Sequence, residues 1–308
     1  MAQVICHKRL PAVYTPLAHK IINEKGVGVI VAISNEVIEK GLREYQKSQK
    51  SDTLKYSLLK IIGVAGFLGI WQLAVVSGMI DAGRLPAPTT IFKTLVYKVY
   101  NDQPDGNILF VNIIASLQVA LSGFLTAIVI GIPLGLVMGW WKNADRFIRP
   151  IFELIRPIPP IAWIPLIVVW MGIGLKAKAM IIFFTTFVPC VINSYTGIKL
   201  TNQTLINVSK TFGASNLEIF FKVGIPSALP MTFAGIRVAL GNSWSTLVAA
   251  EMLAASAGLG YMIQIGRSVA RPDIVIVGMV VIGVIGAVLS AILSYAESKL
   301  MRWQKHRR

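Results

Sequence analysis

The sequence predicts an all-α membrane protein with six transmembrane helices and both termini in the cytoplasm. The chain of 308 residues has a mean hydropathy of +0.66, and 14% of its residues are charged, against about 25% in soluble domains. A transmembrane helix needs about 20 predominantly apolar residues. Six stretches have this character: 57–80, 109–140, 154–174, 178–198, 228–254 and 274–296.

The basic residues predict how these helices are oriented. Most of the 30 Lys and Arg residues fall in four segments, and the connections between those segments hold few of them. Cytoplasmic segments of membrane proteins are enriched in Lys and Arg, so this alternation places the four segments in the cytoplasm. The net charge of +16 therefore reflects topology in a lipid bilayer and requires no nucleic-acid partner. The segments are 1–60, 141–156, 199–237 and 299–308.

The hydropathy pattern divides the chain into three parts. Residues 1–56 contain an apolar run, 26–34, that is too short to span a bilayer. We expect residues 1–56 to form a cytoplasmic N-terminal extension that lies on the membrane or on a neighbouring subunit. Residues 57–300 are expected to form the six-span domain, and residues 301–308 a basic cytoplasmic tail.

Glycines in the second span predict close helix packing. Gly131, Gly135 and Gly139 lie four residues apart and form one smooth stripe along a helix. Stripes of small residues let a neighbouring helix approach closely inside a membrane. We therefore expect this stripe to face another span.

A polar segment, 204–230, separates the fourth and fifth spans. It is predicted to form a helix up to Phe212, a break at Gly213 and a second short helix. Ser215 with Glu218 three residues later fits a capping box. Glycine at position 224 and proline at position 226 are expected to end the second helix, because Gly favours the position after a helix and Pro cannot continue one.

The second short helix carries bulky apolar side chains. Leu217, Phe220 and Phe221 lie on a helix of fewer than two turns, which is too short to be stable alone. Such a helix suits insertion into a groove on another protein. The alternative is a plain helical hairpin in which Gly and Pro only mark the ends of the helices.

The same segment resembles the coupling loop of permease subunits from bacterial ATP-binding-cassette importers. That loop reads Glu-Ala-Ala, three residues, Gly, nine residues and then Ile-x-Leu-Pro, and Gly213, Val223, Ile225 and Pro226 stand at the matching positions. The triplet that begins at Asn207 departs from the pattern, so no salt bridge from this position is implied. The resemblance implies a permease domain with a coupling loop at 204–226. The residues it implies for ATPase coupling are Gly213, Ala214, Ser215, Leu217, Glu218, Phe220, Phe221, Ile225 and Pro226.

The third span contains four prolines, at 157, 159, 160 and 165, which prevent one regular helix. Broken helices at membrane depth usually line a pathway. The run from Arg156 to Leu166 resembles the R-P-x-P-P-x-A-W-x-P-L run of nitrate, sulfonate and taurine permeases. Arg156, Pro160 and Trp163 are therefore candidates for the path or its gate. Arg156 either stabilises an anion or anchors the span at the cytoplasmic surface.

The fifth span is unusually polar. Asn242, Trp244 and Ser245 offer hydrogen bonds at mid-membrane depth, and Glu251 follows. This run resembles the W-x-x-x-V-x-A-E-M pattern of the same permeases, and all four residues are candidates for the path or gate. A carboxylate within a span is costly and is a functional candidate. Glu251 either holds the gate or the dimer together through a buried hydrogen bond, or it lines the route.

No catalytic or cofactor-binding motif is present in the sequence. It lacks the G-x-x-x-x-G-K-[ST] phosphate-binding loop, and its three histidines and two cysteines have no metal-ligand spacing. Cys6 and Cys190 fall in the extension and in a span, so no disulfide is expected. We expect a non-catalytic subunit that holds no metal or cofactor of its own.

The resemblance implies the partners and the cargo. A permease of this family pairs with a second copy, as a homodimer, and with two cytoplasmic ATPases that bind ATP and Mg²⁺. An extracytoplasmic solute-binding protein delivers the cargo at a bacterial inner membrane. The expected cargo is a small anion such as nitrate, bicarbonate, taurine, or an alkyl or aryl sulfonate. The alternative is a self-sufficient channel or secondary transporter without an ATPase partner.

Overall fold

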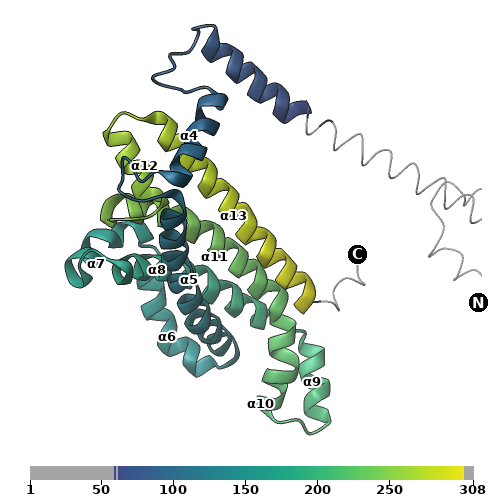
Figure 1. The fold of residues 1–308 in the computed structure, drawn as a ribbon. Coiled ribbons are helices and arrows are strands. Elements are labelled where there is room, and N and C mark those ends of the chain that lie inside the picture. The colour runs from purple at the N-terminus through teal and green to yellow at the C-terminus, as the bar shows by residue number, and fades with distance from the viewer. Residues whose placement is uncertain (1–58, 60–61, 302–308) are drawn as a thin grey trace, which may run out of the picture. The chain divides into compact units, whose positions relative to one another are not determined.

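The computed structural model describes residue 59 and residues 62–301, and the regular structure among them is helical (Figure 1). The predicted extension 1–56, and residues 302–308 of the predicted tail 301–308, lie outside the described residues. The chain divides at Ile70 into two units, and the second unit holds all the labelled helices. These are α4 (Pro88–Tyr100), α5 (Leu109–Trp140), α6 (Lys142–Ile155), the 3₁₀ turn η1 (Pro160–Trp163), α7 (Ile164–Met171), α8 (Leu175–Lys199), α9 (Gln203–Thr211), α10 (Asn216–Ile219), the π-turn η2 (Phe220–Gly224), α11 (Ile225–Ala254), α12 (Leu259–Ser268) and α13 (Pro272–Leu300).

Four described helical segments are long and apolar enough to cross a membrane. They correspond to the predicted second, fourth, fifth and sixth spans: Leu109–Trp140, Leu175–Lys199, Asn216–Leu253 and Pro272–Leu300. The described part of the predicted first span is the helix Ile62–Val76, which is shorter than a bilayer crossing. The total of six spans and the cytoplasmic position of the termini stay predictions.

The predicted third span, 154–174, is not one regular helix: it contains the last two residues of α6, then η1 and α7. Helix α6 and the pair formed by η1 and α7 meet at a bend of 80°. The bend follows from the prolines, because a proline ring removes a backbone donor and clashes with the preceding helical turn. The prediction that the proline run prevents one regular helix is therefore confirmed.

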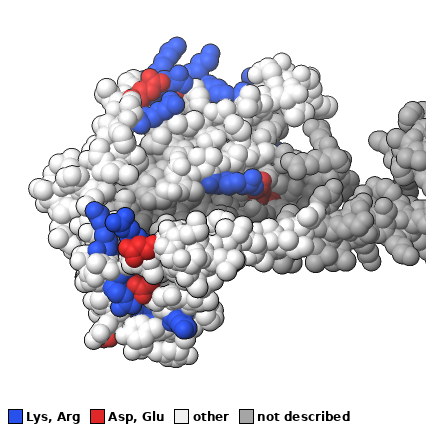
Figure 2. Space-filling model, turned by 90° about the horizontal axis from the view of Figure 1, so that it is seen from above, with Lys and Arg blue, Asp and Glu red and all other residues white. Residues whose placement is uncertain are grey.

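The surface of the spans is largely apolar. Exposed large side chains on the long helices include Val129, Val284 and Ile292, and the visible charges gather in a few groups separated by uncharged surface (Figure 2). In water such a surface would be costly, whereas lipid chains cover it without penalty. The exposed surface agrees with several membrane-crossing helices.

The prediction that Gly224 and Pro226 end the second short helix is wrong. Gly224 has helical dihedral angles, with φ −62°, and Pro226 lies in the first turn of α11. The π-turn η2 explains the difference, because the Ile225 N–H donates to the Phe220 carbonyl five residues back. A proline is tolerated in the first turn that follows. Helix α10 is therefore the start of one long helical segment and does not stand alone.

Helix α8 lies between α5 and α11 and contacts both at very short range. A Cβ atom at Gly135 would lie 2.4 Å from the Val191 carbonyl oxygen, and one at Gly139 would lie 2.8 Å from Ile198. On the other side of α8, a Cβ at Gly235 of α11 would lie 2.4 Å from the Asn193 side chain. The predicted packing role of the glycine stripe is confirmed.

We expect Gly135→Ala to destabilise the protein by about 1–3 kcal/mol, because the added methyl group collides with backbone that cannot move aside. The measurement is the midpoint of unfolding by dodecyl sulfate of the purified protein. Gly283→Ala on α13 is the control, since a Cβ there meets nothing within 4 Å. Equal midpoints for the two variants would contradict the packing role.

Candidate functional site

A cavity of about 330 Å³ opens where α6, η1, α8 and α11 meet. The structure brings five of the seven path candidates to it. These are Arg156, Pro160, Trp163, Asn242 and Ser245. Residues from three separate parts of the sequence thus line one hollow, as expected for a path through the protein.

The cavity has a polar wall and an aromatic wall. The polar wall comes from α8 and α11 and includes Thr185 and Thr246, both of which are more than nine-tenths buried. The aromatic wall is formed by Trp163 and Phe184, whose rings stack at a centroid distance of 5.1 Å with an interplanar angle of 10°. Thr185 was missed by the sequence analysis, because a single threonine in an apolar span gives no distinctive signal.

The hydroxyl groups on the polar wall point their hydrogens at the backbone. Thr185 Oγ1 donates to the Ile181 carbonyl at 3.0 Å, and Ser245 Oγ donates to the Gly241 carbonyl at 3.1 Å. Thr246 Oγ1 donates to the Asn242 carbonyl at 2.9 Å. The hydroxyl oxygens therefore remain available as acceptors.

Trp244 does not line the cavity with its neighbours. Its indole nitrogen donates to the Ile282 carbonyl at 3.0 Å, next to Gly286 of α13. Successive residues on a helix point about 100° apart, so Trp244 and Ser245 face different elements. Trp244 holds α11 against α13.

Glu251 is buried and ties α11 to α5. Its carboxylate accepts hydrogen bonds from Ser116 Oγ, at 2.8 Å, and from the Gly260 N–H, at 2.9 Å. Ser116 Oγ also accepts the Leu259 N–H at 2.8 Å. Glu251 does not line the cavity. Of its two predicted roles, this arrangement supports the structural one.

A buried ion pair lies at the same end of the bundle as Glu251. Lys98 and Asp105 form an ion pair of 2.5 Å, and neither side chain is accessible to solvent. Asn112 links this pair to the turn before α12, because it donates to Asp105 at 2.7 Å and accepts the Gly258 N–H at 2.9 Å. This pair was not predicted from the sequence, because Lys98 of α4 and Asp105 of the following loop lie in a segment with ordinary charge content.

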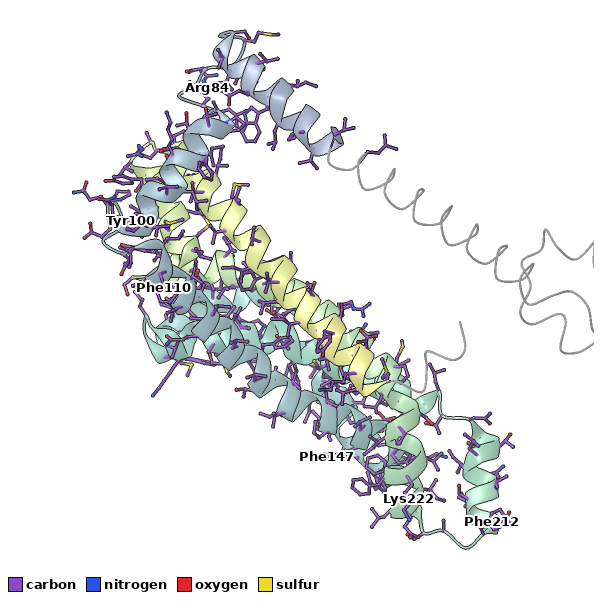
Figure 3. All side chains as sticks on the ribbon, turned by 45° about the vertical axis from the view of Figure 1, so that its right-hand side comes forward. Arg84, Tyr100, Phe110, Phe147, Phe212 and Lys222 are labelled. Carbon is purple, nitrogen blue, oxygen red and sulfur yellow. The ribbon has the colours of Figure 1, made fainter. Side chains whose placement is uncertain are left out.

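The coupling candidates form a hairpin at the opposite end of the bundle. Gly213 makes the turn with φ +78°, a conformation that favours glycine. Ser215 and Glu218 form the predicted capping box: the Glu218 N–H donates to Ser215 Oγ at 3.3 Å and the Ser215 N–H to Glu218 Oε2 at 2.9 Å. Ala214, which lies between Gly213 and Ser215 in the chain, is half-buried. In Figure 3, Phe212 and Lys222 mark this end, while Arg84 and Tyr100 mark the other.

The apolar residues of the hairpin divide into an inner and an outer set. Phe220 is buried against Trp140 and Trp141, with ring centroids 5.5 Å and 4.8 Å away. Ile225 is half-buried beside the same cluster, and Pro226 is exposed. The outer set is Leu217, Phe221 and Phe212, with exposed fractions of 58%, 62% and 86%. Phe220 therefore anchors the hairpin to its own chain, and Phe212, missed by the sequence analysis, joins the exposed set.

We expect Glu251→Gln to lower stability by about 1–3 kcal/mol, because the amide has one acceptor oxygen where the carboxylate has two, and its NH2 group would face buried donors. Unfolding by dodecyl sulfate measures the loss. Glu153→Gln, at an exposed carboxylate of α6, is the matched control and should leave the midpoint unchanged. A Glu251→Gln variant as stable as the control would show that the network does not hold the helices together.

Comparisons with known proteins agree on one family. The family described as "binding-protein-dependent transport system inner membrane component" matches residues 127–302. A putative ABC transporter permease protein of Methanocaldococcus jannaschii is 38% identical over 82% of this chain and 94% of its own length. The taurine transport system permease protein of Escherichia coli is 34% identical over 80% of this chain and 89% of its own.

Two further matches extend this picture. The bicarbonate transport system permease protein of Synechocystis is 31% identical over 83% of this chain and 91% of its own. A chain of the inward-facing MetNI methionine ABC transporter has a similar fold, with a TM-score of 0.53 and 20% identity, and the match covers 63% of this chain and 94% of that one. Several apolar helices and these relatives together identify a multi-pass membrane protein. The chain therefore belongs to the binding-protein-dependent family of inner-membrane permeases of ABC importers.

Proposed function

We propose that this chain forms the translocation path of an ATP-driven importer for a small anion and couples that path to a separate ATPase. The observation that carries the proposal is the hairpin formed by α9, α10 and η2, which presents exposed Leu217, Phe221 and Phe212 at one end of the bundle. Exposed aromatic and aliphatic side chains at the tip of a helical hairpin fit a hydrophobic groove on a partner protein. Permeases of this family bind an ATPase on the cytoplasmic side, so we assign this groove to the ATPase.

The hairpin has a continuous mechanical link to the cavity. Helix α10 passes through η2 into α11 without a non-helical residue. Helix α11 then supplies Asn242, Ser245 and Thr246 to the cavity wall. A displacement of α10 by the ATPase would thus tilt a helix that lines the path, which is the requirement for alternating access.

The proposal also assigns places to the other subunits of the importer. ATP and Mg²⁺ would bind to the partner ATPases, since this chain lacks a phosphate-binding loop. A second copy of the chain would complete the path, and a solute-binding protein would deliver the cargo at the end that carries α4 and α12. Under this proposal the chain positions and moves but performs no chemistry.

The cavity supports an anionic cargo. Among the described residues that line it, Arg156 is the only charged one, and no described carboxylate pairs with it. An unpaired guanidinium beside a hollow attracts an oxyanion by charge and by its fork of N–H donors. Relatives named for the transport of taurine and bicarbonate are consistent with this class of cargo.

The test is a pull-down of the tagged chain from its native membrane in mild detergent, with partners identified by mass. We expect a P-loop ATPase in equal amount. The double variant Leu217→Asp, Phe221→Asp should reduce its recovery by more than about tenfold, because two charged side chains cannot enter an apolar groove.

Leu205→Asp is the matched control, as Leu205 is exposed on α9 near the base of the same hairpin. It should retain the ATPase, and all variants should reach the membrane fraction in equal amount. An intact complex without an ATPase would contradict the proposal and favour a self-sufficient channel or secondary transporter. Full ATPase recovery by the double variant would remove the coupling role of the hairpin.

A further inference from the structure

We propose that Lys178, in the first turn of α8, is an anion-binding residue at the outer entrance of the path, and that a layer of buried apolar side chains closes the path between Lys178 and the cavity. The outer entrance is the end of the bundle away from the hairpin. This inference rests on the proposed function, because it takes the cavity as part of the path of an anionic cargo. It adds a second basic residue, which receives the anion before Arg156 does.

Lys178 is a buried cation that has no direct partner. It is 7% exposed, and no hydrogen bond or ion pair joins its side chain to another residue in the described part of the chain. Lys98, which is also buried, has such partners: it forms an ion pair with Asp105 at 2.5 Å and donates to the Asp102 carbonyl at 2.9 Å. Burying an unpaired charge is costly, so an unpaired lysine within a span is a candidate for a functional role.

Glu251 attracts Lys178 but does not pair with it. The Glu251 carboxylate is close enough to interact electrostatically with the Lys178 ammonium. Its oxygens already accept hydrogen bonds from Ser116 Oγ, at 2.8 and 2.9 Å, and from the Gly260 N–H, at 2.9 Å. Glu251 is thus held by α5 and α12. The Lys178 ammonium is not fully enclosed by protein and remains free to meet a mobile anion.

The start of α8 adds positive potential around Lys178. Its first turn contains Lys176 and Lys178 but no acidic residue, and no side chain caps the turn. The free N–H groups at the start of a helix carry a partial positive charge, which makes lysine unfavourable there. A bound anion would offset the charges of both lysines and of the helix terminus.

Lys178 lies on the side of α8 that leads to the cavity. Thr185 follows Lys178 by seven residues, which places the two residues on the same face of the helix, about two turns apart. Thr185 lines the cavity, and Arg156 is the charged residue there. A path along this face of α8 would therefore connect Lys178 with Arg156.

A layer of apolar side chains interrupts this path. On α8, Ile181 and Ile182 lie between the first turn and the residues that line the cavity. Ile181 belongs to one buried cluster with Ala250 of α11, and Ile182 belongs to another with Leu247. All four side chains are at most 1% exposed. An ion cannot cross such a layer without losing its hydration, so the layer closes the path until α11 moves relative to α8.

The test measures how fast a charged thiol reagent reaches the cavity from outside. The reporter is Ser245→Cys, at a residue that lines the cavity, in a chain that also carries Cys6→Ala and Cys190→Ala. Right-side-out membrane vesicles with the whole importer complex are loaded with ATP and vanadate, or with neither. The anionic 2-sulfonatoethyl methanethiosulfonate or the cationic 2-(trimethylammonio)ethyl methanethiosulfonate is then added outside.

We expect both reagents to react with Ser245→Cys much faster when ATP and vanadate are present, because the apolar layer then opens. Under these conditions Lys178→Met should lower the ratio of the anionic to the cationic reaction rate about tenfold. The reason is that a positive charge at a narrow entrance concentrates anions and repels cations.

Lys176→Met is the matched control. Lys176 belongs to the same helical turn but is exposed and points about 200° away from Lys178, so its loss should leave the rate ratio nearly unchanged. Lys178→Arg keeps the charge and should keep the ratio. Unfolding by dodecyl sulfate shows whether the variants are equally stable. A purely structural Lys178 would lower the unfolding midpoint in Lys178→Met without changing the ratio.

An unchanged rate ratio in Lys178→Met would overturn the role of Lys178, and so would an equal fall in Lys176→Met. Equal reaction rates with and without nucleotide would overturn the closed apolar layer. The absence of any reaction from outside in both states would overturn the placement of Lys178 on a route to the cavity. Recovery of an ATPase in the pull-down does not depend on Lys178, so any of these failures alone leaves the proposed importer function standing.

Discussion

The rest of the structure depends on the close approach of α8 to α5 and α11. In lipid, apolar side chains gain little by leaving the surroundings for a helix interface, so stable association relies on tight packing and polar contacts. Glycines at 123, 135 and 139 of α5 bring its backbone close to α8, and Gly235 does the same on α11. Because α8 is fixed on both sides, Thr185 and Pro189 face the same hollow as Asn242 and Ser245.

Buried polar contacts are the second interaction that holds the helices together in lipid. Ser116, Glu251 and the first N–H groups of α12 satisfy one another at the end of the bundle away from the hairpin. Lys98 and Asp105 neutralise each other nearby. Unpaired groups at these positions would be costly in a low-dielectric surrounding, so the network also fixes the orientation of the helices that carry it. Hydrogen bonds and an ion pair thus hold one end of the bundle together, whereas the hairpin end presents exposed apolar side chains.

Features encoded by neighbouring residues could be predicted from the sequence. The glycine stripe, the capping box of Ser215 and the proline bend each depend on residues within one or two helical turns. The end assigned at Gly224 was wrong because Gly and Pro are compatible with a π-turn as well as with a stop. Which of Trp244 and Ser245 faces the cavity could not be assigned until the neighbours of α11 were known. The partner of Glu251 depends on the tertiary fold, and no local pattern marks Ser116.

The distance along the sequence between bonded side chains determines when each contact can form during biosynthesis. Lys98 and Asp105 are close in sequence, so their pair can form soon after the ribosome has released them. Ser116 is synthesised 135 residues before Glu251, and Asn112 precedes Gly258 by 146 residues. Until α11 emerges, Ser116 must find a temporary partner in the translocation machinery, in water or in lipid headgroups, whereas Asn112 can already donate to Asp105. The end of the bundle that carries this network is therefore closed late in biosynthesis, after most of the chain has already entered the bilayer.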